Sequence, residues 1–245
     1  MTIVFPMAGL SSRFLNAGYK IPKYMLKIQN KTVFYNAVFG FKHYFKDCNF
    51  LFIYRDIYNT EKFIADECEK LKIKNKILVK LDDETQGQAH TVMLGLEKAY
   101  IDDNESILIF NIDTFRYNYI LPDFDYEKLD GYLEVFQADG EQWSFVLPGD
   151  DKNVLKTTEK ERISNLCSSG LYYFKKGKDF KDSFKFSYEN RLYVKNELYI
   201  APLYNYLIKN DKQIKYHEIN LSDIIFCGTP QDYEKFSHSQ ITNQP

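Results

Sequence analysis

The sequence lacks the two glycine patterns that most often mark a phosphate-binding loop. No Gly-x-Gly-x-x-Gly run follows a predicted strand, and no Gly-Lys-Ser/Thr triplet closes a glycine-led loop. These absences argue against a dinucleotide-binding fingerprint and against a P-loop. Apolar runs are also short, and no positively charged segment with an apolar stretch opens the chain. We therefore expect neither membrane insertion nor a secretory leader.

An excess of charge of either sign is missing as well. The chain has 32 Lys and Arg against 34 Asp and Glu, a net charge of -2. It thus has no basic footprint for nucleic acid. The 4 cysteines form neither a paired framework nor a metal-ligand spacing, so we expect reduced thiols in a cytoplasmic protein. With 245 residues, 44% of them apolar, the chain can bury a sizeable core.

What the sequence does have is an apolar N-terminal strand, residues 2–7, that leads into small residues and then cations. Gly9 lets a ligand approach the backbone because it has no Cβ, and two serines offer N–H and O–H groups that can form an anion-binding nest. The guanidinium of Arg13 and the ammonium of Lys23 both suit phosphate oxygens. The segment therefore predicts a triphosphate site. The residues predicted to form it are Met7, Ala8, Gly9, Leu10, Ser11, Ser12, Arg13 and Lys23.

Strand and helix patterns alternate through the first half of the chain. The predicted strands there are 2–7, 50–54, 76–81 and 106–112, and the predicted helices are 33–46, 60–71 and 88–99. In the second half the predicted strands are 131–136, 143–147, 152–156, 170–174 and 214–219, and the predicted helices are 199–208 and 231–236. This alternation predicts an α/β fold with a Rossmann-like, doubly wound, mainly parallel mixed sheet. Ligands bind such sheets at the carboxyl ends of the strands.

Two more loops are expected at that edge of the sheet. Asp113 follows the most apolar strand, and its carboxylate suits Mg²⁺, which fills most of its coordination shell with phosphates and water. The alternative is an aspartate that only ends the strand. Gln86, Gly87 and Gln88 open a helix after another strand, where a base can lie against Gly87 and a glutamine amide can read a pyrimidine edge. The alternative is an ordinary helix cap, and either glutamine could read the base.

The loop with Arg13 and the pair Pro22-Lys23 resembles the signature of the nucleotidyltransferases that activate sugar 1-phosphates and related phosphates. Their pattern is Gly-x-Gly-Thr/Ser-Arg, followed after a spacer by Pro-Lys; here Ser11 replaces the second glycine, and Tyr24 stands where a proline often follows the lysine. The resemblance implies the nucleotidyltransferase fold with a small acceptor-binding lobe. It also implies that Asp113 binds Mg²⁺ as a catalytic residue together with Arg13 and Lys23.

Motifs in the second half follow the order of this family, which implies a nucleotide-binding half of about 1–113 and an acceptor-binding half of about 114–245 within a single domain, 1–245. The residues implied to bind the acceptor are Trp143, Glu159, Lys160, Gly170 and Glu197. The late motif Gly228-Thr229-Pro230 also matches, but many members have a second metal-binding aspartate two residues before that glycine. This chain has Phe226 there.

Within the family, the chain is most similar to the small cytidylyltransferases of capsule gene clusters, in particular those that act on phosphoglutamine in the capsular O-methyl phosphoramidate pathway. This similarity implies CTP and L-glutamine phosphate as substrates, with CDP-L-glutamine and pyrophosphate as products. The expected reaction is attack of the acceptor phosphate on the α-phosphorus of CTP. Arg13 would hold the β- and γ-phosphates, and Lys23 would bridge the α-phosphate and the acceptor. The acceptor phosphate is already ionised, so no general base is needed.

Other readings of the sequence stay open. The acceptor could be a sugar 1-phosphate or phosphocholine. Because Phe226 replaces the second aspartate, the chain could also be a nucleotide-binding regulatory protein without catalysis. A glycosyltransferase would usually carry Asp-x-Asp, where this chain has Asn111-Ile112-Asp113. No segment marks out a dimer face, so a homodimer stays an open alternative.

Overall fold

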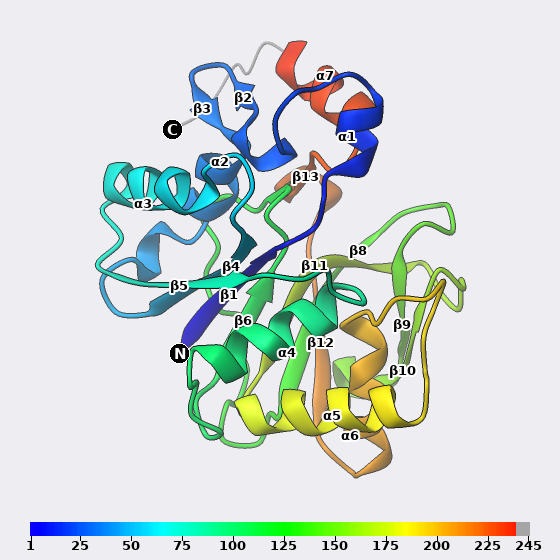
Figure 1. Ribbon diagram of the computed structural model, residues 1–245. Helices are drawn as coiled ribbons and strands as arrows, with labels where there is room; N and C mark the ends of the chain where they lie inside the picture. Colours follow the sequence, from blue (N-terminus) through cyan, green and yellow to red (C-terminus); the bar gives the residue numbers. More distant parts are fainter. Residues whose placement is uncertain (239–245) are drawn as a thin grey trace.

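A nine-stranded mixed sheet runs through the computed structural model, which describes residues 1–238 (Figure 1). Its strands are β1 (Thr2–Met7), β4 (Asn49–Arg55), β5 (Asn75–Leu81), β6 (Ile107–Phe110), β8 (Gly131–Gln137), β9 (Ser144–Pro148), β10 (Val154–Glu159), β11 (Leu166–Phe174) and β12 (Ile214–Glu218). The order is β10-β9-β11-β6-β1-β4-β5, and β8 pairs with β11 and β12. The pairs among β6, β1, β4 and β5 are parallel, whereas β11 is antiparallel to β6, β8 and β9.

Helices cover both faces of the parallel strands. Alternate residues of β1 face opposite layers: Ile3 and Phe5 pack with α2 (Val33–Phe39) and α3 (Thr60–Leu71), whereas Val4 packs with α4 (Gln88–Lys98). The helices α5 (Gly177–Glu189) and α6 (Tyr204–Lys209) lie on the same side as α4 (Figure 1). Strands buried on both faces need continuous apolar runs, which is why β6 reads Ile-Leu-Ile-Phe. The doubly wound mixed sheet is thus confirmed.

Several predicted element bounds differ from the structure. The predicted helix 33–46 ends at Phe39, because the carbonyl of Gly40 accepts a hydrogen bond from the Tyr119 N–H (3.0 Å) rather than one from the next helical turn. A Cβ on Gly40 would also lie 2.3 Å from the carbonyl oxygen of Arg116. The helix α5 has no counterpart among the predicted elements. The predicted helix 199–208 is a 3₁₀ turn, η4 (Ala201–Leu203), followed by α6.

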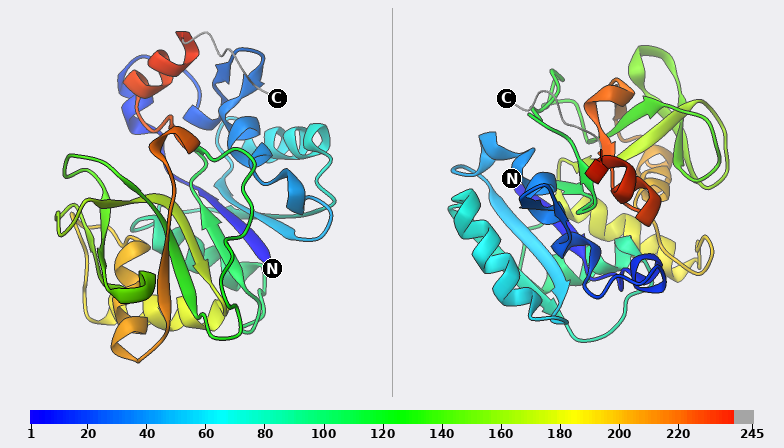
Figure 2. Two further views of the ribbon diagram at one scale, coloured as in Figure 1. Left: turned by 180° about the vertical axis from the view of Figure 1, so that it is seen from behind. Right: turned by 90° about the horizontal axis from the view of Figure 1, so that it is seen from above.

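Short elements close the end of the sheet that carries the N-terminal loop. They are α1 (Ser12–Asn16), η1 (Lys23–Met25), β2 (Lys27–Ile28), β3 (Lys31–Thr32), β7 (Thr114–Phe115), η5 (Leu221–Asp223), β13 (Ile225–Phe226) and α7 (Pro230–His238). Two further 3₁₀ turns lie elsewhere: η2 (Lys42–Tyr44) precedes the start of β4, and η3 (Asp150–Lys152) lies beside Lys215 at the start of β12. The last helix, α7, lies beside the N-terminal loop (Figures 1 and 2), where the Tyr233 ring is 6.1 Å from that of Phe14. The strands β7 and β13 form a separate antiparallel pair in which Phe226 pairs with Thr114. None of the helices within residues 1–238 combines the length and apolar character needed to cross a bilayer.

Candidate functional site

Two adjoining cavities open at the carboxyl ends of β1 and β6, with volumes of about 390 and 930 Å³. The smaller is lined by Pro6, Met7, Ala8, Gly9, Ser11, Lys23, Tyr24, Thr85, Gly87, Gln88, Thr91, Asn111, Ile112, Asp113 and Glu197. Residues on the larger include Leu10, Ser12, Arg13, Trp143, Glu159, Lys160, Gly170, Phe226 and Asp232. The residues that line both are Ser11, Lys23, Gln88, Asn111 and Asp113. This is the edge where doubly wound sheets bind ligands.

The N-terminal loop curls around the shared part of the cavities. Ser11 adopts a left-handed backbone (φ 55°), and its Oγ accepts a hydrogen bond from the Lys23 N–H at 3.2 Å, which ties the two ends of the loop together. Arg13 is exposed on the wall of the larger cavity. A Cβ built on Gly9 would meet no protein atom within 4 Å. The protein's own packing therefore does not require a glycine there, and the open space in front of Gly9 is available to a ligand.

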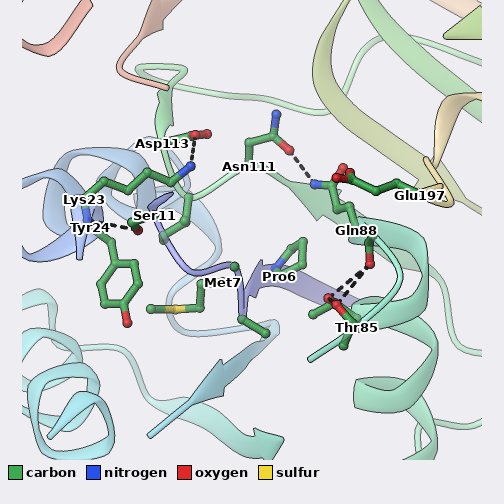
Figure 3. A pocket seen from close by; sticks show the side chains of 15 residues that line it. Pro6, Met7, Ser11, Lys23, Tyr24, Thr85, Gln88, Asn111, Asp113 and Glu197 are labelled. Carbon is green, nitrogen blue, oxygen red and sulfur yellow. Dashed lines mark hydrogen bonds and ion pairs between the residues drawn. The ribbon is translucent and has the colours of Figure 1, made fainter. Parts of the chain in front are cut away.

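Lys23 and Asp113 meet across this space, where Lys23 Nζ donates a hydrogen bond to Asp113 Oδ2 (Figure 3). Both side chains are partly exposed, at 25% and 17% respectively. The main chain of Asp113 is held beside the β7–β13 strand pair, because its carbonyl accepts a hydrogen bond from the Cys227 N–H at 2.8 Å. Burial, together with the carboxylates of Asp113 and Asp232, raises the pKa of Cys227 to about 12, so this thiol is neutral.

Gln88 is the glutamine of the predicted base loop that faces the cavities. Its Nε2 donates a 2.5 Å hydrogen bond to Asn111 Oδ1 (Figure 3). Gln86, by contrast, lines neither cavity; the Tyr193 hydroxyl approaches its Oε1 at 3.4 Å, and its N–H donates to Nδ1 of His90 at 3.1 Å. Asn111 was missed as a site residue, although its place two residues before Asp113 at the end of a buried strand was a usable signal.

The base loop is joined to the segment around Glu197 by backbone hydrogen bonds. Leu198 N–H donates to the Gln86 carbonyl at 2.8 Å, and Ala89 N–H donates to the Leu198 carbonyl at 3.0 Å. Gly87 has φ 104°, and a Cβ there would lie 2.6 Å from the Leu198 oxygen. A side chain at position 87 would therefore push the two segments apart. Glu197, predicted to bind the acceptor, lines the smaller cavity beside Gly87 and Gln88.

The other residues predicted to bind the acceptor lie together on the larger cavity. Glu159 accepts a hydrogen bond from Ser144 Oγ, and its Oε1 is 3.6 Å from Lys160 Nζ. Burial raises the pKa of the Glu159 carboxyl, although Ser144 and Lys160 oppose this shift. Lys160 Nζ also donates a 2.5 Å hydrogen bond to the Tyr199 hydroxyl. Gly170 has φ 88° and lies against Asn111, so it supports the wall shared by both cavities.

Three aromatic rings form one wall of the larger cavity. The ring centroid of Trp143 lies 5.2 Å from that of Phe136 and 5.0 Å from that of Phe226, and the Phe136 and Phe226 centroids are 5.3 Å apart. Asp232 lines the same cavity, but its Oδ2 accepts a 2.6 Å hydrogen bond from Thr229 Oγ1 at the start of α7. The sequence motif Gly-Thr-Pro-x-Asp includes Asp232 but gave it no role in the site, and Phe136 was not singled out, because only the folded chain brings them to this wall.

The donor set around Asp113 fits a magnesium ion that takes few ligands from the protein. Asp113 offers a hard carboxylate oxygen next to a loop suited to phosphates, and Mg²⁺ commonly completes its shell with substrate phosphates and water. Within residues 1–238 there is no group of three or more His, Cys, Asp and Glu side chains that could enclose a metal ion.

The sheet, its flanking helices and the cavities at its carboxyl edge define an α/β protein of the nucleotidyltransferase fold. The structure superposes on the nucleoside-diphosphate-sugar pyrophosphorylase from Vibrio cholerae RC9 with a TM-score of 0.92 and 45% identity, over 97% of this chain and 100% of that one. The chain therefore belongs to the sugar-phosphate nucleotidyltransferase family.

More distant structures share the fold. A putative glucose-1-phosphate thymidylyltransferase from Bacillus anthracis matches with a TM-score of 0.76 at 18% identity, over 100% of this chain and 96% of that one. The inositol-1-phosphate CTP transferase from T. maritima matches with a TM-score of 0.72 at 15% identity, over 96% and 94%. Neither a family model nor a curated protein sequence matches the chain.

Proposed function

We propose that this protein transfers a nucleotidyl group from a nucleoside triphosphate to a small phosphorylated acceptor and releases pyrophosphate. The observation that carries this proposal is that Lys23 and Asp113 line both cavities at once. A triphosphate held by the N-terminal loop and an acceptor held beside Glu159 and Lys160 would then meet at these two residues. Such a transfer needs alignment and charge stabilisation more than acid–base chemistry.

Each cation has a separate role in this proposal. Arg13, on the wall of the larger cavity, holds the β- and γ-phosphates and stabilises the leaving pyrophosphate. Lys23 offsets the repulsion between the α-phosphate and the acceptor phosphate. Asp113 would hold Mg²⁺, which when bound orients the phosphates and neutralises their charge. Gln88, oriented by Asn111, is the glutamine in position to read the base.

Two acceptor classes have support. The Bacillus anthracis and T. maritima relatives are named for glucose 1-phosphate and inositol 1-phosphate, which favours a cyclic polyol phosphate such as a sugar 1-phosphate. L-Glutamine phosphate with CTP is the second candidate, because the sequence resembles the capsule-cluster cytidylyltransferases. The aromatic wall of Trp143 and Phe226 also suits it, since a chain of methylene groups can bury its surface there.

The test is pyrophosphate release with Mg²⁺. CTP, UTP, GTP, ATP and dTTP are each offered against sugar 1-phosphates, L-glutamine phosphate and phosphocholine. The Arg13→Ala variant should lose turnover, whereas Lys20→Ala, which removes a cation from the same loop outside both cavities, should retain it. Turnover with one pair identifies the substrates. CTP binding without release over the whole panel would contradict catalysis and favour a regulatory protein.

A further inference from the structure

We propose that the metal ion enters this site only together with the nucleotide, because Lys23 occupies the Asp113 carboxylate beforehand. This inference rests on the proposed function, since it takes a triphosphate as the ligand of the N-terminal loop. Lys23 Nζ donates directly to Asp113 Oδ2 (Figure 3). A divalent cation that approached the free protein would have to displace an ammonium group already paired with its ligand.

The remaining carboxylates on the cavities do not offer a substitute. Those of Glu159, Asp232 and Glu197 are each held by a neighbour: Glu159 by Ser144 and Lys160, Asp232 by Thr229, and Glu197 by the Tyr199 hydroxyl. A cation alone would therefore have to break an existing contact at any of them. Mg²⁺ sheds its waters reluctantly and binds best where several anionic oxygens converge.

Phe226 occupies a position beside Asp113 from which a carboxylate could have completed a metal site in the free protein. Its backbone pairs with Thr114, next to Asp113, and its ring lines the same cavity as Asp113. At position 226, the side of the cavity next to Asp113 therefore carries an aromatic ring, which packs on Trp143 and Phe136. A carboxylate at this position would have offered two oxygens to a metal ion. The phosphates of the nucleotide supply the missing oxygens, and they also attract Lys23 away from Asp113.

Two substitutions should create metal binding in the free protein. Phe226→Asp adds a carboxylate beside Asp113, and Lys23→Met frees Asp113 without touching the aromatic wall. The matched control is Lys20→Met, which removes the same charge from the exposed part of the loop. Binding is measured with Mn²⁺ alone, from the loss of the free-ion signal in electron paramagnetic resonance. Circular dichroism checks that each variant is folded.

We expect Mn²⁺ to bind Phe226→Asp and Lys23→Met roughly tenfold or more tightly than it binds the wild type. Lys20→Met should match the wild type. If Phe226→Asp does not fold, Lys23→Met decides the question by itself. The inference is overturned if the wild type binds Mn²⁺ alone as tightly as the folded variants do, or if Lys20→Met gains as much as Lys23→Met.

Calorimetric titration of the wild type with CTP separates this inference from the proposed function. CTP should bind more tightly with Mg²⁺ than without, and by linkage the ion gains the same factor in affinity from CTP. Equal CTP affinity with and without Mg²⁺ would overturn the coupling while leaving nucleotide binding intact. Absence of binding under both conditions for CTP and for the other four triphosphates would instead count against the proposed function, and the comparison of variants with Mn²⁺ alone would still stand.

Discussion

Gly170→Ala should disturb the wall shared by the two cavities. Gly170 has φ 88°, a conformation that L-residues rarely adopt. An added Cβ would also lie 2.2 Å from Asn111 Nδ2 and 2.7 Å from Asn111 Cγ. The Asn111 side chain, which is easier to displace than the backbone of β11, must therefore move, and the hydrogen bond that it accepts from Gln88 is then lost.

The cost follows from three contributions. A left-handed alanine costs about 1 kcal/mol, the lost hydrogen bond about 1 kcal/mol, and the crowding in a packed wall about 1 kcal/mol or more. Together these lower the free energy of unfolding by roughly 3 kcal/mol. For a chain of this size, that corresponds to a fall in Tm of roughly 6–12 °C. Nucleotide affinity should fall as well, because Gln88 loses the partner that orients it.

Thermal unfolding of the single and double variants tests this reasoning. In Asn111→Ala/Gly170→Ala the clash is absent, so adding Gly170→Ala to Asn111→Ala should cost only the backbone term of about 1 kcal/mol. The alanine at position 170 should thus be much less harmful when Asn111 is already shortened. The reasoning is refuted if Gly170→Ala lowers Tm equally in both backgrounds, or leaves the wild-type Tm unchanged.

Four further substitutions probe the site and its surroundings. Arg13→Ala and Lys23→Ala should each cost about 3 kcal/mol of barrier, or roughly 100-fold in turnover; wild-type rates would contradict their roles. Gly9→Ala should leave Tm unchanged but weaken nucleotide binding in calorimetry, since its Cβ enters only ligand space; unchanged affinity would place the ligand elsewhere. Burial lowers the pKa of His90, and its Nδ1 accepts a hydrogen bond from the Gln86 N–H, which requires the neutral imidazole. The neutral form therefore contributes its full stabilisation of the fold at pH values above the pKa of the unfolded state, about 6.5. That stabilisation is lost as pH falls through the lower folded pKa, and the fall in Tm between pH 7 and 5 should be smaller in His90→Asn; equal slopes would contradict this.

The fold was predictable where local pattern and burial agree. The strands in the first half and α3 follow continuous apolar runs or one amphipathic face, and the structure confirms their type and nearly their bounds. The helix α5 was missed because lysines and aspartates surround its few buried residues, Phe180 and Phe184 among them. The early end of α2 depends on the loop around Arg116, which is distant in sequence, so no local signal could reveal it.

The candidate site was likewise predictable only in part. The residues from Met7 to Arg13 are consecutive, so their suitability for binding phosphates is visible in the sequence, and the structure brings them to the cavities. The contact between Lys23 and Asp113 joins residues 90 positions apart, and the aromatic wall of Phe136 and Phe226 joins a strand of the main sheet to one of the separate β7–β13 pair. Such pairings arise from strand order, which a single sequence does not encode locally.

The shared strand β11 has a consequence for any attempt to divide this protein. Its later residues pair with Phe110 and the rest of β6, while Cys167 pairs with Phe145 in β9. A fragment that stopped at Asp113 would leave one edge of β6 without a neighbour, and that edge is entirely apolar and buried in the intact chain. Open apolar edges recruit other strands and aggregate. Chimaeras that exchange the acceptor half should therefore carry β11 from the same parent as β6.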